Sequence, residues 1–124
     1  MKKRLMILLL LAPLVNADEP LPSDEEIGLT LAHTMEVARR INANGMSYQM
    51  LKRCGANPDL LKKTKRFLYQ DIAKTERQNP KAKVDVDGLF DHAAAAGDDY
   101  YETLKANPKL CPAMLEEANK YVAN

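Results

Sequence analysis

The chain has 124 residues, of which 46% are hydrophobic and 28% charged, and its formal net charge is +1. This length suits a single domain. With only five glycines and two cysteines, the composition excludes collagen-like, low-complexity and disulfide-dense proteins.

The first 17 residues have the layout of a secretory signal peptide. Residues 2–4 are basic and precede an apolar run over residues 5–15, which is shorter than the roughly 20 residues that a membrane-spanning helix needs. Small residues follow this run, so we expect cleavage between Ala17 and Asp18. The protein would then be periplasmic or secreted, without stable insertion in the membrane.

Removal of residues 1–17 also reverses the charge balance. It takes away three basic residues and no acidic one, which leaves 15 basic and 17 acidic residues and a net charge of −2. Because phosphate binding needs a basic face, we expect no nucleic-acid partner. Residues 18–22 are predicted to form a flexible tail, and residues 23–124 a helical domain.

The first helix is predicted from its caps and its apolar stripe. Ser23 begins it, and Glu26 completes a capping box three residues later. Gly55 suits a left-handed cap at its C-terminal end. Residues 42–45 (Asn-Ala-Asn-Gly) weaken the stripe and predict either a kink or a break in this helix.

Three further helices follow, each with a recognisable start. Their start and stop signals are, in chain order, Asn57-Pro58, Asn79-Pro80, Asp85 or Asp87, and Asn107-Pro108. No stretch alternates apolar and polar residues as a half-buried strand does. We therefore predict an all-α fold, a small four-helix bundle, with up-and-down order as the default and two orthogonal helical hairpins as the alternative.

The two cysteines are predicted to form one disulfide that closes this bundle. Cys54 ends the first helix and Cys111 lies in the first turn of the fourth, and in up-and-down order these points lie at the same end of the bundle. An exported chain with an even number of cysteines normally oxidises them. The loop-entropy model gives such a bridge about 4 kcal/mol of stabilisation. The alternative, a catalytic thiol pair, needs C-x-x-C spacing.

The sequence carries no recognised catalytic or metal-binding pattern. His33 and His92 are the only histidines, and neither has a second ligand three or four residues further on. Residues 85–88 (Asp-Val-Asp-Gly) resemble part of a calcium loop, but Lys83 and Ala94 occupy its end positions. We therefore expect no metal ion, cofactor or catalytic residue; an enzyme acting through scattered carboxylates is the alternative.

Charge and small residues point instead to a binding surface. Residues 52–83 hold ten basic and three acidic residues, whereas residues 85–102 hold six acidic and no basic ones. Either these helices pair their charges, or the two faces point outward and orient a charged partner. The small residues 93–97 allow close packing within the chain or a groove for a partner helix. Such a groove is predicted to involve Met46, Met50, Ala93, Gly97, Tyr100 and Tyr101.

With these helices and this bridge, the chain resembles the small all-helical pilotins of type II secretion. The matching features are Cys54-Gly55, the distance to Cys111 and residues 100–104 (Tyr-Tyr-Glu-Thr-Leu), and the resemblance covers residues 48–122. Pilotins hold a helical tail of the outer-membrane secretin; many carry a lipid-anchored cysteine at the cleavage site, whereas the first cysteine here is Cys54.

The resemblance implies a groove for a partner helix, and hence a periplasmic adaptor or chaperone-like protein. The absence of catalytic patterns predicts that the protein is not an enzyme. The alternative is an inhibitor or immunity protein that blocks a toxin or hydrolase. A charged loop protruding at residues 79–84 would favour that alternative.

Overall fold

The computed structural model describes residues 21–123, and all regular structure in this part of the chain is helical. This confirms the predicted all-α fold with four helices. The predicted signal peptide and residues 18–20 of the predicted tail lie outside the described residues. The helices are α3 (Asp24–Arg53), α4 (Pro58–Gln78), α5 (Val86–Leu104) and α6 (Leu110–Ala123).

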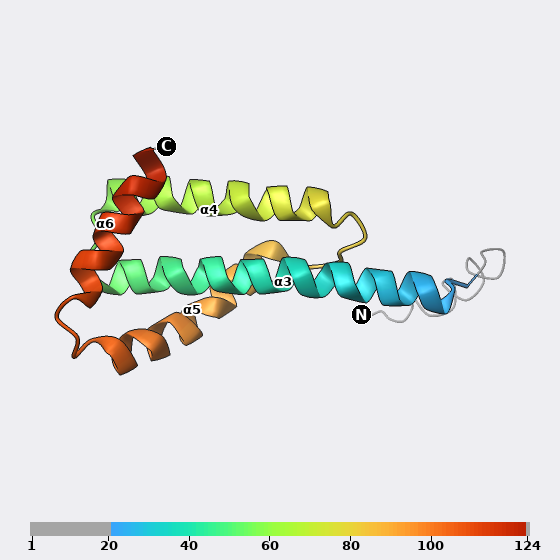
Figure 1. The fold of residues 1–124 in the computed structure, drawn as a ribbon, viewed down its shortest axis with the longest axis horizontal. Helices are drawn as coiled ribbons and strands as arrows, with labels where there is room; N and C mark the ends of the chain where they lie inside the picture. The colour runs from blue at the N-terminus through green and yellow to red at the C-terminus, as the bar shows by residue number, and fades with distance from the viewer. Residues whose placement is uncertain (1–20, 124) are drawn as a thin grey trace, which may run out of the picture.

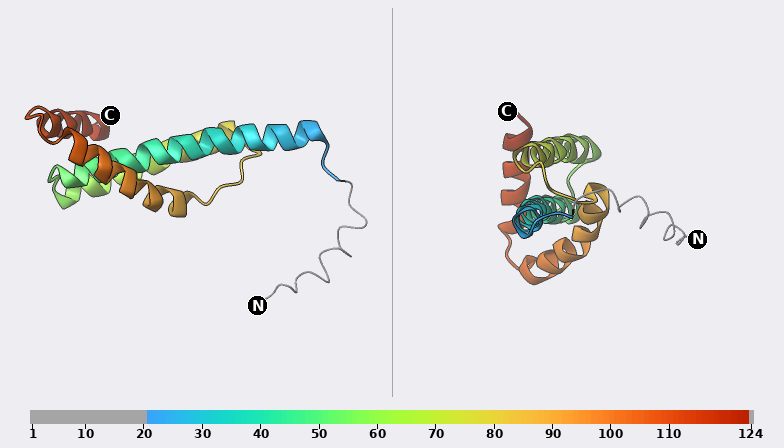
Figure 2. Two further views of the ribbon diagram at one scale, coloured as in Figure 1. Left: turned by 90° about the horizontal axis from the view of Figure 1, so that it is seen from below. Right: turned by 90° about the vertical axis from the view of Figure 1, so that its right-hand side faces the viewer.

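The longest helix, α3, is the scaffold on which the others pack. Figure 1 shows α4 running antiparallel beside α3, α5 lying obliquely along another side of α3, and α6 lying across the ends of α3 and α4. The views in Figure 2 agree with this arrangement. The last helix thus departs from simple up-and-down order, because it contacts α3 and α4 together instead of running beside one of them.

The apparent interruption of α3 at residues 42–45 is a packing feature. The helix is continuous through this segment. Asn44 is buried, and its Nδ2 donates hydrogen bonds to the Leu68 carbonyl oxygen at 3.2 Å and to Asp71 at 3.0 Å. Gly45 lets α5 approach closely, since a Cβ atom there would lie 2.6 Å from the carbonyl oxygen of Phe90.

The caps of the helices largely follow the sequence signals. Ser23 accepts a hydrogen bond from the Glu26 amide, and Asn57 accepts one from the Leu60 amide. Of the two candidates for α5, the cap is Asp85, whose side chain accepts from the Gly88 amide.

The start of α6 differs from the prediction. It begins at Leu110, later than the Asn107-Pro108 signal suggested, because turns occupy residues 105–109. In these turns the Asn107 amide donates to the Leu104 carbonyl, and the Asn107 carbonyl accepts from the Leu110 amide.

Two clusters of buried apolar side chains form the core. The larger one joins α3, α4 and α5 and contains Val37, Ile41, Leu68, Ile72 and Phe90. The smaller one joins α3, α4 and α6 and contains Leu51, Leu60 and Ala118. Of the two clusters, only the smaller one includes residues of α6.

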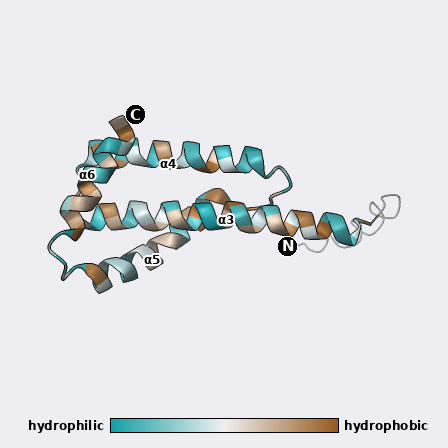
Figure 3. Cartoon of the chain, viewed as in Figure 1, coloured by the Kyte–Doolittle hydropathy of each residue, from teal (hydrophilic) through white to brown (hydrophobic). Residues whose placement is uncertain are grey.

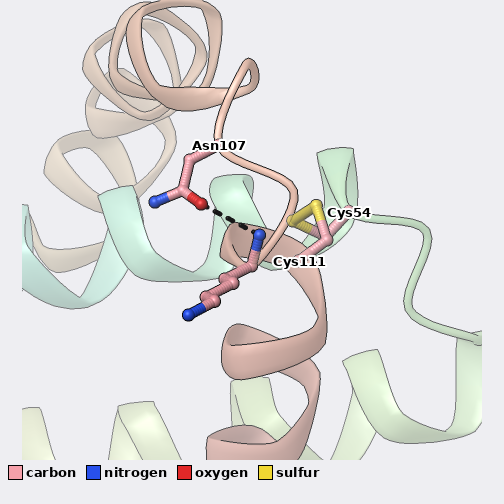
Figure 4. Close-up of a disulfide and its surroundings, with 4 residues drawn as sticks. Cys54, Asn107 and Cys111 are labelled. Carbon is pink, nitrogen blue, oxygen red and sulfur yellow. Dashed lines mark hydrogen bonds between the residues drawn. A yellow bond between two sulfur atoms is a disulfide. The ribbon is translucent and has the colours of Figure 1, made fainter.

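The predicted disulfide is present, between Cys54 at the C-terminal end of α3 and Cys111 in the first turn of α6 (Figure 4). The two Cα atoms are 5.2 Å apart, although 57 positions separate the cysteines in the sequence. The bridge fixes the start of α6 beside the point where α3 ends and α4 begins.

We predict that Gly45→Ala lowers the free energy of unfolding by about 1–3 kcal/mol, because the backbone of α5 has to move away from the added methyl group. Gly28→Ala is the matched control: it lies in the same helix, and a Cβ atom there meets nothing within 4 Å. The control should gain about 1 kcal/mol from helix propensity. Urea unfolding followed by circular dichroism measures both, and a similar gain for the two variants would contradict the close approach.

Candidate functional site

A groove of about 720 Å³ lies between α3, α4 and the crossing helix α6. Successive turns of α3 present positions 40, 44, 47 and 51 to it, and α4 presents positions 64, 68 and 71, so one face of each helix lines the groove. Its apolar lining comes from all three helices and includes Leu51, Leu68, Leu110, Met114, Ala118 and Tyr121.

A buried hydroxyl without a partner lies among these apolar side chains. Thr64 is 5% exposed, and its Oγ1 has no hydrogen-bond partner within residues 21–123. Thr75, on the same helix and equally buried, instead donates its hydroxyl to the Asp71 carbonyl at 3.0 Å. A buried polar group that lacks a partner destabilises the fold. The wall of the groove therefore contains one hydroxyl whose hydrogen bonds are not made within residues 21–123.

Polar residues surround the apolar interior. At one end Arg40 pairs with Asp71 at 3.5 Å, and Asn44 also binds this carboxylate. At the other end Lys109 and Glu117 line the groove. An apolar centre within a polar rim is the composition of protein-binding surfaces.

Tyr121 forms part of the wall that α6 contributes. Its ring meets the edge of Phe67 with centroids 5.7 Å apart, and its hydroxyl donates to the Phe67 carbonyl at 3.4 Å. Burial raises the pKa of Tyr121, which keeps the hydroxyl neutral at physiological pH. This contact fixes α6 against α4 along the groove.

Of the six residues predicted to line a groove, Met46, Ala93 and Gly97 lie at the contact between α3 and α5. Ala93 and Gly97 are buried there, and a Cβ atom at Gly97 would lie 2.7 Å from Cβ of Gln49 and 2.8 Å from the Met46 carbonyl oxygen. The small residues of α5 therefore serve close packing within the chain.

The remaining members of this set differ in exposure. Met46 and Met50 are half-buried. Tyr101 lies under the guanidinium of Arg53, 4.4 Å from its ring centroid, while Tyr100 is 51% exposed. A role for these residues in partner binding stays a prediction.

The opposite charges of the two central segments are only partly paired. Arg53 at the end of α3 binds Asp98 at 3.1 Å and Glu102 at 2.5 Å on α5. Hydrogen bonds from Gln49 and then Arg53 lower the pKa of Asp98, and bonds from Lys105 and then Arg53 lower the pKa of Glu102. Both carboxylates are therefore ionised at neutral pH and suit ion pairing better than proton donation.

A second, shallower hollow gathers titratable groups between α4 and α5. It is lined by Lys62, Lys65, Arg66, Tyr69, Asp87 and Asp91. The Tyr69 hydroxyl donates to Asp87 at 2.8 Å, and burial together with this bond raises the pKa of Tyr69 to about 12. Tyr69 is thus a neutral hydrogen-bond donor, not a base.

The two histidines lie apart from both hollows. His33 on α3 accepts a hydrogen bond from the Lys81 amide through its Nδ1 at 3.1 Å, and His92 on α5 is exposed. Within residues 21–123 no three His, Cys, Asp or Glu side chains converge as metal ligands would.

No helix of residues 21–123 is long and apolar enough to cross a bilayer. Comparison of the chain with protein-family models, with curated proteins and with solved structures finds no match. The groove among α3, α4 and α6 therefore has to be interpreted from its own chemistry.

We predict that Thr64→Val raises the free energy of unfolding by about 1 kcal/mol, because it replaces an unpaired buried hydroxyl by a methyl group. Thr75→Val is the matched control, since it removes a hydroxyl that is hydrogen-bonded and should lower the free energy of unfolding or leave it unchanged. Chemical denaturation measures both. Destabilisation by Thr64→Val as large as that by Thr75→Val would show that the Thr64 hydroxyl is already paired.

Proposed function

We propose that this protein is an exported, non-catalytic binding protein, an adaptor or chaperone, whose groove between α3, α4 and α6 holds a helical segment of a protein partner. The observation that carries the proposal is the unpartnered Thr64 hydroxyl within an apolar groove. Such a site combines apolar area for affinity with one polar group for selectivity.

The dimensions and walls of the groove favour a helix as its occupant. It follows α3 from position 40 to position 51, a distance of roughly 16 Å at the helical rise of 1.5 Å per residue. That length accommodates about three helical turns. Since helices pack by fitting the side chains of one into the grooves between others, an amphipathic segment with an apolar stripe matches Leu51, Leu68 and Met114.

The sequence of the N-terminal segment and the disulfide support an exported setting. A bridge between Cys54 and Cys111 suits an oxidising compartment such as the periplasm, which is where the leader over residues 1–17 would direct the chain. The resemblance to pilotins in residues 48–122 favours a partner helix that belongs to a secretion apparatus.

An inhibitor or immunity protein is the alternative, and the connection between α4 and α5 bears on it. The amide of Lys81 donates to His33, and the amide of Lys83 donates to the Thr34 hydroxyl at 3.0 Å. These bonds hold the connection against α3. A protruding charged loop, the feature that would favour an inhibitor, is therefore absent at residues 79–84.

Site-specific photo-crosslinking in the exporting cell tests the proposal. We expect a crosslinker at Ser47, an exposed position that lines the groove, to capture a segment of one partner protein with apolar residues at helical spacing. The same crosslinker at Gln70, exposed on α4 and not part of the groove lining, is the control.

A groove-filling variant completes the experiment. Ala113→Trp should abolish the Ser47 adduct, because Ala113 also lines the groove. Equal capture from Ser47 and Gln70, an adduct that survives Ala113→Trp, or capture of lipid alone would contradict a helix-binding groove.

A further inference from the structure

The first turns of α3 carry an apolar stripe that nothing in residues 21–123 covers. We call residues 24–36 the arm; Figures 1 and 3 show the first turns of α3 projecting beyond the link between α4 and α5, with hydrophobic bands. Ile27, Leu31 and Met35 are 53%, 58% and 62% exposed. Their spacing of four residues puts them on one face of the helix, and exposed apolar patches mark interaction surfaces.

The chain itself uses a different face of the arm. The link between α4 and α5 binds the arm through His33 and Thr34, which leaves the stripe centred on Leu31 open. Any occupant of the stripe is therefore external to the four helices.

We propose that this occupant is a second copy of the same chain, with the two arms packed antiparallel about a two-fold axis at Leu31. In this register Leu31 meets Leu31 of the second copy. Ile27 meets Met35 of the second copy, and Met35 meets Ile27, since each pair lies four residues on either side of the axis. One stripe is thus self-complementary, as an isologous interface requires.

The charges of the arm select the antiparallel orientation. Asp24, at the acidic start of the helix, lies seven residues before Leu31, and Arg39 lies eight residues after it. The Arg39 side chain is 74% exposed and pairs with Glu36 of its own helix. Antiparallel pairing therefore places Asp24 beside Arg39 of the second copy at both ends, whereas parallel pairing aligns like charges. Complementary flanking charges set helix orientation in this way in coiled coils.

Cysteine crosslinking tests the contact at the axis. The experiment uses the secreted chain, whose N-terminus is determined by mass spectrometry. Leu31→Cys adds a free thiol to a chain whose own two cysteines are bridged, and we expect a covalent dimer under mild oxidation. Leu29→Cys is the matched control: it is also exposed, at 44%, but lies on the opposite face of the arm. Crosslinking of Leu29→Cys to the same extent would overturn the proposal.

A mixing experiment tests the orientation. When Ile27→Cys and Met35→Cys chains are mixed in equal amounts, antiparallel arms give mainly the mixed disulfide dimer. Parallel arms would join each variant mainly to itself, which would overturn the register.

Sedimentation of the unmodified chain and of Leu31→Glu provides the independent measurement. We expect a concentration-dependent dimer for the former and a monomer for the latter, since two carboxylates would meet at the axis. A monomer for the unmodified chain throughout the micromolar range would overturn the proposal. Because Leu31 lies outside the groove lining, the Ser47 photo-adduct should persist in Leu31→Glu. The dimer proposal and the groove proposal can therefore fail independently of each other.

Discussion

The groove depends on the covalent bond that fixes α6 across α3 and α4. Cys54 and Cys111 join the end of the first described helix to the start of the last. The other attachments of α6 are a small apolar cluster around Ala118 and the contact of Tyr121 with Phe67. A helix of 14 residues is marginal by itself in water. The bridge therefore defines the orientation of α6, which forms one wall of the groove, and with it the volume of the groove.

The rest of the architecture depends on the different faces of α3. One face receives α5 at Gly45, where the absence of a side chain allows close contact. Another meets α4 through Asn44 and the core around Ile41. The groove runs beside the contact with α4, since Asn44 also lines it, and the open stripe of the arm occupies a further face. A single long helix thus organises the core, the proposed partner site and the proposed self-association site.

Much of this fold follows from local signals in the sequence. Ser23 and Asn57 begin helices as predicted because capping chemistry is local, and the pairing of Cys54 with Cys111 follows from chain topology. The groove could not be predicted in the same way, since the crossing of α6 depends on packing between segments far apart in the sequence. Its one sequence signal was Thr64, which with Thr75 interrupts the apolar stripe of α4. Among residues 93–97, for which the sequence left both close packing and a partner groove open, Ala93 and Gly97 pack against α3.

The most direct test of this account is hydrogen–deuterium exchange in the bridged chain and in the double variant Cys54→Ser/Cys111→Ser. In the bridged chain the amides of α6 should be protected from exchange. In the double variant, which lacks the bridge, they should exchange nearly as fast as in an unfolded peptide. Amides of α3 and α4 around Ile41 and Ile72 should remain protected, because their cluster does not involve α6. Equal protection of α6 in both proteins would contradict the claim that the disulfide positions this helix and maintains the groove.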